Sequence, residues 1–160
     1  MSSIRTFAFA AILGAALAVQ PALAFDPASA REVNLDGQGL ALGGYDPVAY
    51  FTLGKPVKGA ESIVETYNGS RYIFADEEDR ALFAKSPGKY VPEFGGFCSY
   101  AAAKGYKADA DPQAWKIVGG KLYLNYNKEV ATTWQADIPG YIHKAEANWP
   151  KISSKAPKDF

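Results

Sequence analysis

Alternating apolar and polar residues predict a β-hairpin in the first half of the chain. Residues 63–67 and 70–74 are rich in β-branched and aromatic side chains, and the second segment places Tyr72 and Phe74 on the same face. The Asn-Gly pair at 68–69 suits a two-residue type I′ turn between the two strands. We therefore expect an antiparallel hairpin with one buried aromatic face.

A second hairpin is predicted at residues 115–118 and 121–125, which a Gly-Gly pair separates. A helix is expected after each hairpin, because Asp76 and Asn127 stand where a side chain can cap the first helical turn. The two hairpin-then-helix units invite a comparison, although no internal repeat appears in the sequence.

Two further helices complete the predicted fold. Residues 97–105 form a short helix with a glycine at each border. The other helix begins at Pro139, stops at Pro150 and has an apolar stripe, whose members are Ile138, Ile142, Ala145 and Trp149. We predict a single compact α+β domain of two antiparallel hairpins packed with several short helices.

The N-terminal residues 1–24 have the pattern of a signal peptide. Arg5 precedes an apolar, Ala-rich run, and a small-x-small signature ends at Ala24. The apolar run of about a dozen residues is shorter than the roughly 20 that cross a bilayer as a helix. We expect cleavage after Ala24, a periplasmic or secreted mature protein, and no membrane span.

The mature chain is expected to have three parts: an extended arm at 25–42, the folded domain at 43–150, and a solvated, flexible tail at 151–160. The whole chain has 17 basic and 17 acidic residues, with the two signs interleaved. Neither a nucleic acid nor an anionic membrane is therefore expected as a partner.

The first hairpin and the helix after it contain a motif. Residues 67–74 read Tyr-Asn-Gly-Ser-Arg-Tyr-Ile-Phe, and they are followed by a Leu-Phe pair at 82–83 and by Ser-Pro-Gly-Lys-Tyr at 86–90. This arrangement resembles the YHS domain family. Segments 44–51 and 95–100 are similar to the exported, single-domain bacterial members of that family, which implies that the likeness spans most of the mature chain.

Metal binding in the YHS family belongs to members with cysteines around the aromatic hairpin. In this chain Ala75, Glu78 and Asp79 occupy those places. The thiolate pair of those members is therefore absent, and their metal site does not carry over.

The single cysteine is the first candidate for chemistry. Cys98 has no partner for an internal disulfide, and a position at a helix N-terminus lowers the pKa of a thiol and favours the thiolate. His143 is the only histidine and lies at the border of the apolar stripe. Because thiolate and imidazole suit copper, Cys98 and His143 are the predicted metal ligands, with a copper ion as the candidate cofactor. A carboxylate or a second subunit would complete such a site.

Three function classes stay open. The leading one is binding, outside the cytoplasm, of a metal ion at Cys98 or of a small ligand, for which Tyr45, Asp46 and Tyr50 beside a Gly-Gly turn are candidate pocket residues. The same three residues are also typical of a turn cap with two core aromatics. The alternative is a protein-interaction or structural module with an inert Cys98. A thiol-dependent enzyme with a Cys98–His143 dyad ranks third, because the sequence contains no known enzyme motif. We therefore favour a protein without enzymatic activity.

Overall fold

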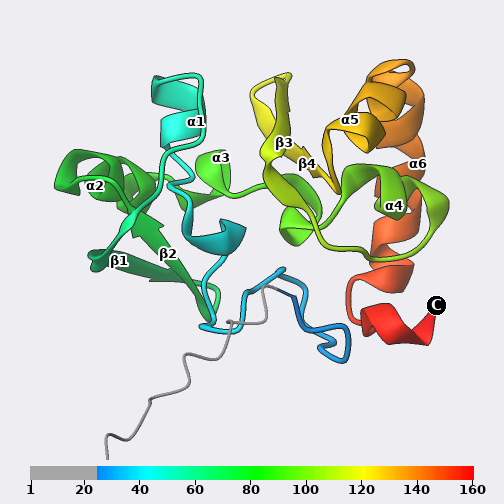
Figure 1. The fold of residues 1–160 in the computed structure, drawn as a ribbon, viewed down its shortest axis with the longest axis horizontal. Helices are drawn as coiled ribbons and strands as arrows, with labels where there is room; N and C mark the ends of the chain where they lie inside the picture. Colours follow the sequence, from blue (N-terminus) through cyan, green and yellow to red (C-terminus); the bar gives the residue numbers. More distant parts are fainter. Residues whose placement is uncertain (1–24) are drawn as a thin grey trace, which may run out of the picture.

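The computed structural model describes residues 25–160 and contains two β-hairpins, each with short helices beside it (Figure 1). The predicted signal peptide and its cleavage site lie outside these residues. The elements before the middle of the chain are η1 (Leu42–Gly44), α1 (Ala49–Thr52), β1 (Ala60–Tyr67), β2 (Ser70–Phe74), α2 (Glu77–Lys85) and α3 (Pro87–Tyr90). Those after it are η2 (Glu93–Gly96), α4 (Ser99–Lys104), β3 (Asp111–Val118), β4 (Lys121–Asn125), α5 (Lys128–Gln135), α6 (Ile138–Ile152) and η3 (Pro157–Asp159).

The predicted α+β class and both hairpins are confirmed. β1 pairs with β2 and β3 pairs with β4, each as a two-stranded antiparallel sheet. The turn residues at 68–69 and 119–120 all have positive φ, as a type I′ turn requires. The aromatic face of the first hairpin is buried through Tyr72 and Phe74, and Ile73 on the opposite face is buried as well.

The predicted helix caps are also present. The Asp76 carboxylate accepts a hydrogen bond from the Asp79 N–H at 2.9 Å, and the Asn127 side chain accepts one from the Val130 N–H at 2.8 Å. Each cap satisfies a backbone donor that the first helical turn leaves without a partner. Local sequence therefore sets the start of both helices that follow the hairpins.

The chain contains two units of the same architecture: the first unit (residues 42–85) and the second unit (residues 94–135). Each consists of a 3₁₀ turn, a short helix, an eight-residue strand, a tight turn, a five-residue strand and a capped helix. Both hairpins are irregular at the same place, since the register shifts between Ala60 and Val64 in one and between Asp111 and Trp115 in the other.

The opening turns of the two units match in backbone conformation. Leu42 and Phe94 have φ of 56° and 53°, and the two glycines after each have φ between 56° and 79°. This left-handed conformation is unfavourable for a residue with a Cβ atom, so its recurrence at the same place is a specific similarity. The two hairpin-then-helix units that the sequence invited us to compare therefore share backbone geometry, although their side chains differ.

Each unit buries its own aromatic cluster. In the first unit, the Phe83 ring on α2 lies 5.1 Å from the ring of Phe74 on β2. In the second unit, the Trp134 ring on α5 lies 5.5 Å from the ring of Tyr123 on β4. The helix after each hairpin therefore packs an aromatic side chain onto the second strand of that hairpin.

The short helix of the first unit contacts the second unit, whereas the short helix of the second unit does not make the equivalent contact with the first. Tyr50 on α1 packs edge-on against Trp115 on β3, with ring centroids 5.2 Å apart, and its hydroxyl donates to the Pro112 carbonyl at 3.0 Å. The short helix of the first unit thus covers the hairpin of the second. The short helix of the second unit, α4, packs instead on α6, where the Asn148 side chain donates to the Ala102 carbonyl at 3.1 Å.

The last helix extends further than predicted. Its apolar stripe packs on the second unit as expected, with Ala145 fully buried. Pro150 does not stop α6, which continues to Ile152. A proline this close to the end of a helix removes one backbone hydrogen bond without blocking the last residues.

The predicted solvated tail is wrong for part of residues 151–160. Ile152, Ser153 and Ala156 are buried, and the Lys158 N–H donates to the Pro27 carbonyl at 2.9 Å. The C-terminal residues therefore close the domain against the N-terminal arm. None of the helices within residues 25–160 combines the length and the apolar character needed to cross a bilayer.

The N-terminal arm runs along the side of both units (Figure 1). The Asn34 N–H donates to the Gly95 carbonyl at 2.8 Å, and Leu40 forms a parallel bridge with Arg71 of β2. Gly95 allows this close approach, because a Cβ atom there would collide with the backbone carbonyl of Glu32. The arm is thus held in place by backbone contacts to each unit.

Candidate functional site

Cys98 caps the short helix α4 from within the core. Its side chain is only 1% exposed, and its sulfur accepts a hydrogen bond from the Ala101 N–H at 3.5 Å. The thiol points toward the Asn125 side-chain oxygen, 3.9 Å away, which also accepts the Tyr100 N–H at 3.2 Å. The sulfur is enclosed by backbone and amide groups of its own unit.

Burial raises the pKa of the Cys98 thiol, and the backbone N–H groups of Ala101, Tyr126 and Tyr100 offset this only in part. The sequence predicts a lowered pKa from the helix N-terminus. That prediction is wrong in direction, because α4 has only six residues and the loss of water around the sulfur outweighs the nearby donors. The thiol is therefore the neutral form at neutral pH.

The predicted metal ligands lie in different environments. His143 is on the exposed side of α6, whereas Cys98 is buried at the start of α4. Within residues 25–160, no three His, Cys, Asp or Glu side chains are grouped so as to hold a metal ion. The described part of the chain thus offers no ready-made copper or zinc cage.

Asp46 is a fully buried carboxylate that organises the first unit. One oxygen accepts the N–H groups of Val48 and Ala49 at 2.8 and 3.3 Å, and the other accepts the Ala75 N–H at 2.8 Å. The carboxylate therefore fixes the start of α1 and ties it to the end of β2. Of the two interpretations of this residue, the turn cap fits these contacts.

Tyr45 and Tyr50 both form hydrogen bonds with residues of the second unit. The Tyr45 hydroxyl accepts from the Gln113 side chain at 3.1 Å, and the Lys58 ammonium lies 4.2 Å from the Tyr45 ring centre. Burial raises the pKa of Tyr50, whose ring is almost fully enclosed. Neither tyrosine lines the pocket described below.

A second carboxyl is buried against Asp46. Burial, followed by the charge of Asp46 and a hydrogen bond to it, raises the pKa of Asp79 to about 7. Two buried carboxyl groups in contact cannot both ionise cheaply, which favours the protonated form of Asp79. This pair could not be predicted from the sequence, because the two residues stand far apart along the chain.

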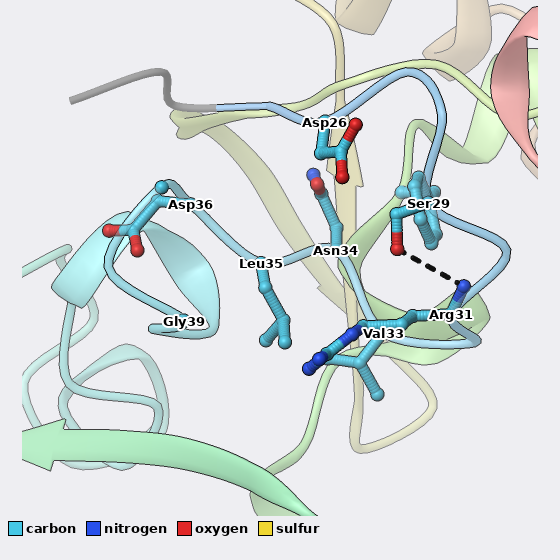
Figure 2. A pocket seen from close by; sticks show the side chains of 10 residues that line it. Asp26, Ser29, Arg31, Val33, Asn34, Leu35, Asp36 and Gly39 are labelled. Carbon is cyan, nitrogen blue, oxygen red and sulfur yellow. Dashed lines mark hydrogen bonds between the residues drawn. The ribbon is translucent and has the colours of Figure 1, made fainter.

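One cavity lies under the N-terminal arm and is here called the arm pocket. Its volume is about 270 Å³, and its walls include Asp26, Ser29, Arg31, Asn34, Asp36 and Phe97. Figure 2 shows the Arg31 side chain extending past Val33 toward Leu35. The sequence predicts an extended arm at residues 25–42 but contains no signal of this pocket, because its walls come from distant parts of the chain.

Among the described residues that line the arm pocket, Arg31 is the only cationic side chain. Within residues 25–160 its guanidinium takes part in none of the ion pairs, which are Arg80 with Glu65 and Glu77 and Lys121 with Glu93. A guanidinium has five donors in a fixed planar array and suits a carboxylate or phosphate. The pocket therefore presents an anion-binding group in an open position.

The backbone of the arm pocket is fixed by a buried lysine. The Lys107 ammonium donates to the carbonyls of Arg31 and Ser153 at 2.8 and 2.9 Å and lies 4.5 Å from the Phe97 ring centre. Burial lowers the pKa of Lys107, although the nearby charge of Glu32 opposes this. The lysine joins the arm, the start of the second unit and the C-terminal segment at one point.

Comparison with protein-family models, with curated proteins and with solved structures gave no match. The likeness to the YHS family therefore rests on the sequence motifs alone and stays a prediction.

Proposed function

We propose that this protein is a binding module for a small polar ligand, which it holds in the arm pocket through Arg31. The observation that supports this proposal is an arginine without an ion pair in residues 25–160, set in the wall of a cavity of about 270 Å³. A few placed polar groups beside apolar walls are the usual composition of a small-ligand site.

Preorganisation of the arm favours this function. The carbonyl of Arg31 is held by Lys107 at 2.8 Å, and the side chain of Asn34 donates to the Asp109 carboxylate at 2.8 Å. A site whose backbone is fixed before binding loses less conformational freedom when the ligand arrives. Because residues 1–24 have the pattern of a signal peptide, we propose that this binding takes place outside the cytoplasm.

The earlier hypothesis of a copper site at Cys98 and His143 is less well supported by this geometry. Cys98 is almost fully buried and its pKa is raised, whereas metals bind the deprotonated thiolate. His143 is exposed on another helix. A metal at Cys98 would require the second unit to open or a second subunit to contribute ligands.

An NMR titration of isotope-labelled protein spanning residues 25–160 tests the proposal. The probes are acetate, phosphate, simple amines, free amino acids, Cu(I) and Zn(II), added separately. The expected result is saturable shifts of the backbone amides of Arg31, Asn34 and Gly39 with at least one organic or anionic probe. Saturable shifts confined to Cys98 and its neighbours with Cu(I) would favour the metal hypothesis instead.

Two variants make the assignment specific. Arg31→Gln removes the guanidinium and should abolish the shifts at these amides. Arg71→Gln is the matched control, because Arg71 is an exposed arginine on β2 outside the arm pocket. Equal loss of binding in both variants would contradict the proposed site.

A further inference from the structure

Two adjoining cavities lie between the N-terminal arm and the turn of the first hairpin, and they are here called the hairpin cleft. Their volumes are about 320 and 200 Å³, and both have Glu32, Val33 and Asn68 in their walls. Trp149 of α6 also lines the smaller cavity. The hairpin cleft is therefore formed by three parts of the chain that are distant in sequence.

Three side chains of the first hairpin bring hydroxyl groups to this cleft. Ser70 and Tyr72 stand two residues apart on β2, and Tyr67 of β1 is the cross-strand partner of Ser70, so the three share one face of the hairpin. Ser70 lines the larger cavity, and the two tyrosines line the smaller one. Strand geometry thus gathers three hydroxyl-bearing residues on the side of the sheet that faces the cleft.

The hydroxyl groups of Ser70 and Tyr72 are buried without a protein partner. The two residues are only 4% and 3% exposed, and neither hydroxyl forms a hydrogen bond within residues 25–160. Among those residues, the fully enclosed side-chain atoms without a partner are Ser99 Oγ and Trp134 Nε1, so the oxygens of Ser70 and Tyr72 still reach the cleft. A buried hydroxyl normally has a hydrogen-bond partner, because leaving it without one costs free energy. The fold therefore leaves two polar atoms in this cleft for a ligand or for water.

The aromatic side chains of the cleft are held in place by the core. The rings of Tyr67 and Tyr72 lie 6.1 and 4.9 Å from the ring of Phe83, and the Trp149 ring lies 5.7 Å from that of Phe94. Burial, followed by the nearby Tyr67, raises the pKa of Tyr72, so its hydroxyl keeps its proton at neutral pH. A ligand would meet groups whose positions are already fixed, which lowers the entropy lost on binding.

The two charged residues in the cleft wall direct their side chains elsewhere. Glu32 turns toward the C-terminal segment, where its Oε1 accepts the Ser153 hydroxyl at 3.2 Å. The Arg31 side chain extends past Val33 toward Leu35, in the arm pocket (Figure 2). The polar groups that remain for a ligand of the hairpin cleft are therefore uncharged.

From these uncharged hydroxyl groups beside aromatic surface we infer that the hairpin cleft binds a neutral carbohydrate. Sugar hydroxyls both donate and accept hydrogen bonds, as serine and tyrosine hydroxyls do, so they satisfy the buried groups of Ser70 and Tyr72. The C–H groups of a sugar ring pack on an aromatic side chain such as Trp149, because the face of its ring carries partial negative charge. This site is separate from the arm pocket, and neither site requires the other.

Other classes of ligand fit the hairpin cleft less well. An ion would lose its water without meeting an opposite charge from the described wall residues, which costs free energy. A purely apolar molecule would displace water from the hydroxyls of Ser70 and Tyr72 and leave both unpaired. The walls favour an uncharged molecule with several hydroxyl groups.

An NMR titration of isotope-labelled protein spanning residues 25–160 tests the inference. The sugar probes are D-glucose, N-acetyl-D-glucosamine and cellobiose, and cyclohexanol is the matched probe with a ring of the same size and a single hydroxyl. We expect saturable shifts of the backbone amides of Ser70 and Tyr72 and of the Trp149 indole N–H with at least one sugar. Cyclohexanol should bind at least about tenfold more weakly than that sugar.

Two variants remove one oxygen each and keep the shape of the cleft. Ser70→Ala and Tyr72→Phe should each weaken sugar binding at least about threefold, the effect of losing a hydrogen bond between uncharged groups. Because neither hydroxyl has a partner in the fold, both variants should be at least as stable as the wild type in urea unfolding. Tyr126→Phe is the control, since Tyr126 is exposed and outside the cleft, and it should change neither property.

Three results would overturn the inference. Cyclohexanol binding as tightly as the sugars would show that the cleft does not select hydroxyl groups. Sugar binding that is unchanged in both Ser70→Ala and Tyr72→Phe would place the sugar elsewhere on the protein. No saturable shift with any of the three sugars would show that the cleft holds only water. None of these results bears on the arm pocket, which the amides of Arg31, Asn34 and Gly39 report separately.

Discussion

Asp46 and Cys98 occupy equivalent positions in the two units. The Asp46 carboxylate accepts the Ala49 N–H at 3.3 Å, and the Cys98 sulfur accepts the Ala101 N–H at 3.5 Å. Each residue also donates its own N–H to the segment before the hairpin, at 2.8 Å from Asp46 and 3.0 Å from Cys98. A side chain that accepts a backbone N–H of the short helix is thus common to both units, and this contact gives Cys98 a structural role as a helix cap.

This equivalence predicts the effect of replacing the sulfur. In Cys98→Ser the hydroxyl can accept the Ala101 N–H and donate to the Asn125 side chain, whereas Cys98→Ala leaves the Ala101 N–H without a partner. We expect Cys98→Ala to be less stable than Cys98→Ser by about 1 kcal/mol, the usual value of a helix N-cap. Urea unfolding followed by circular dichroism measures the difference. An alanine variant as stable as the serine variant would contradict a capping role.

The thiol should react slowly in the folded protein. Because Cys98 is 1% exposed and its pKa is raised, a disulfide reagent at neutral pH should modify it only as fast as the second unit opens. In denaturant the reaction should reach the rate of a free thiol. If Cys98 is modified rapidly in the native protein and slowly in the His143→Ala variant, the result would instead support the thiol-enzyme hypothesis.

The buried carboxyl pair makes stability depend on pH. The pKa of Asp79 is about 7 in the folded state and near its model-peptide value of 3.8 when unfolded, so the folded state binds the proton more tightly. The stabilisation is complete below pH 4 and is lost as the pH rises to 7. We expect Asp79→Asn to flatten this dependence and, at pH 8, to be more stable than the wild type by about 1 to 3 kcal/mol.

Thermal unfolding of both proteins between pH 4 and 8 measures this effect. Asp159→Asn, at an exposed residue of the C-terminal 3₁₀ helix, is the control and should follow the wild-type curve. A wild-type protein whose stability rises from pH 5 to 8 while Asp79→Asn stays level would show that folding does not raise the pKa of Asp79.

Gly95 is predicted to be essential for seating the arm. In Gly95→Ala the new methyl group would meet the Glu32 carbonyl, and its positive φ of 61° adds backbone strain. We expect a loss of about 2 kcal/mol or more and faster amide hydrogen exchange at Asn34. Gly88→Ala is the control, because nothing lies near its Cβ position and its φ is not positive. Equal effects of the two changes would argue against the close contact.

The parts of the fold that sequence analysis predicted are those set by neighbouring residues. The Asn-Gly turn at 68–69 and the caps Asp76 and Asn127 each act within four residues of themselves. The arm pocket depends on contacts such as Lys107 with Arg31, which join distant parts of the chain. No pattern of apolar and polar residues in the sequence predicts such a contact.

The internal repeat did leave a trace in the sequence. Leu42 and Phe94 each precede a Gly-Gly pair and an aromatic residue, in the order apolar-Gly-Gly-aromatic. Only the structure shows that both segments adopt the same left-handed turn. The side chains that follow then diverge, since Asp46 and Cys98 perform one capping role with different chemistry.

The hydrogen bond between Lys158 and Pro27 brings the two ends of the described chain together. Since neither end lies inside a strand, a short linker between them would cost little entropy. A circularly permuted protein, with residue 160 linked to residue 25 and new termini at the Gly119-Gly120 turn, would then fold to the same structure. In that chain the two hairpin strands of the second unit would lie at opposite ends, which would show whether folding requires each unit to be continuous.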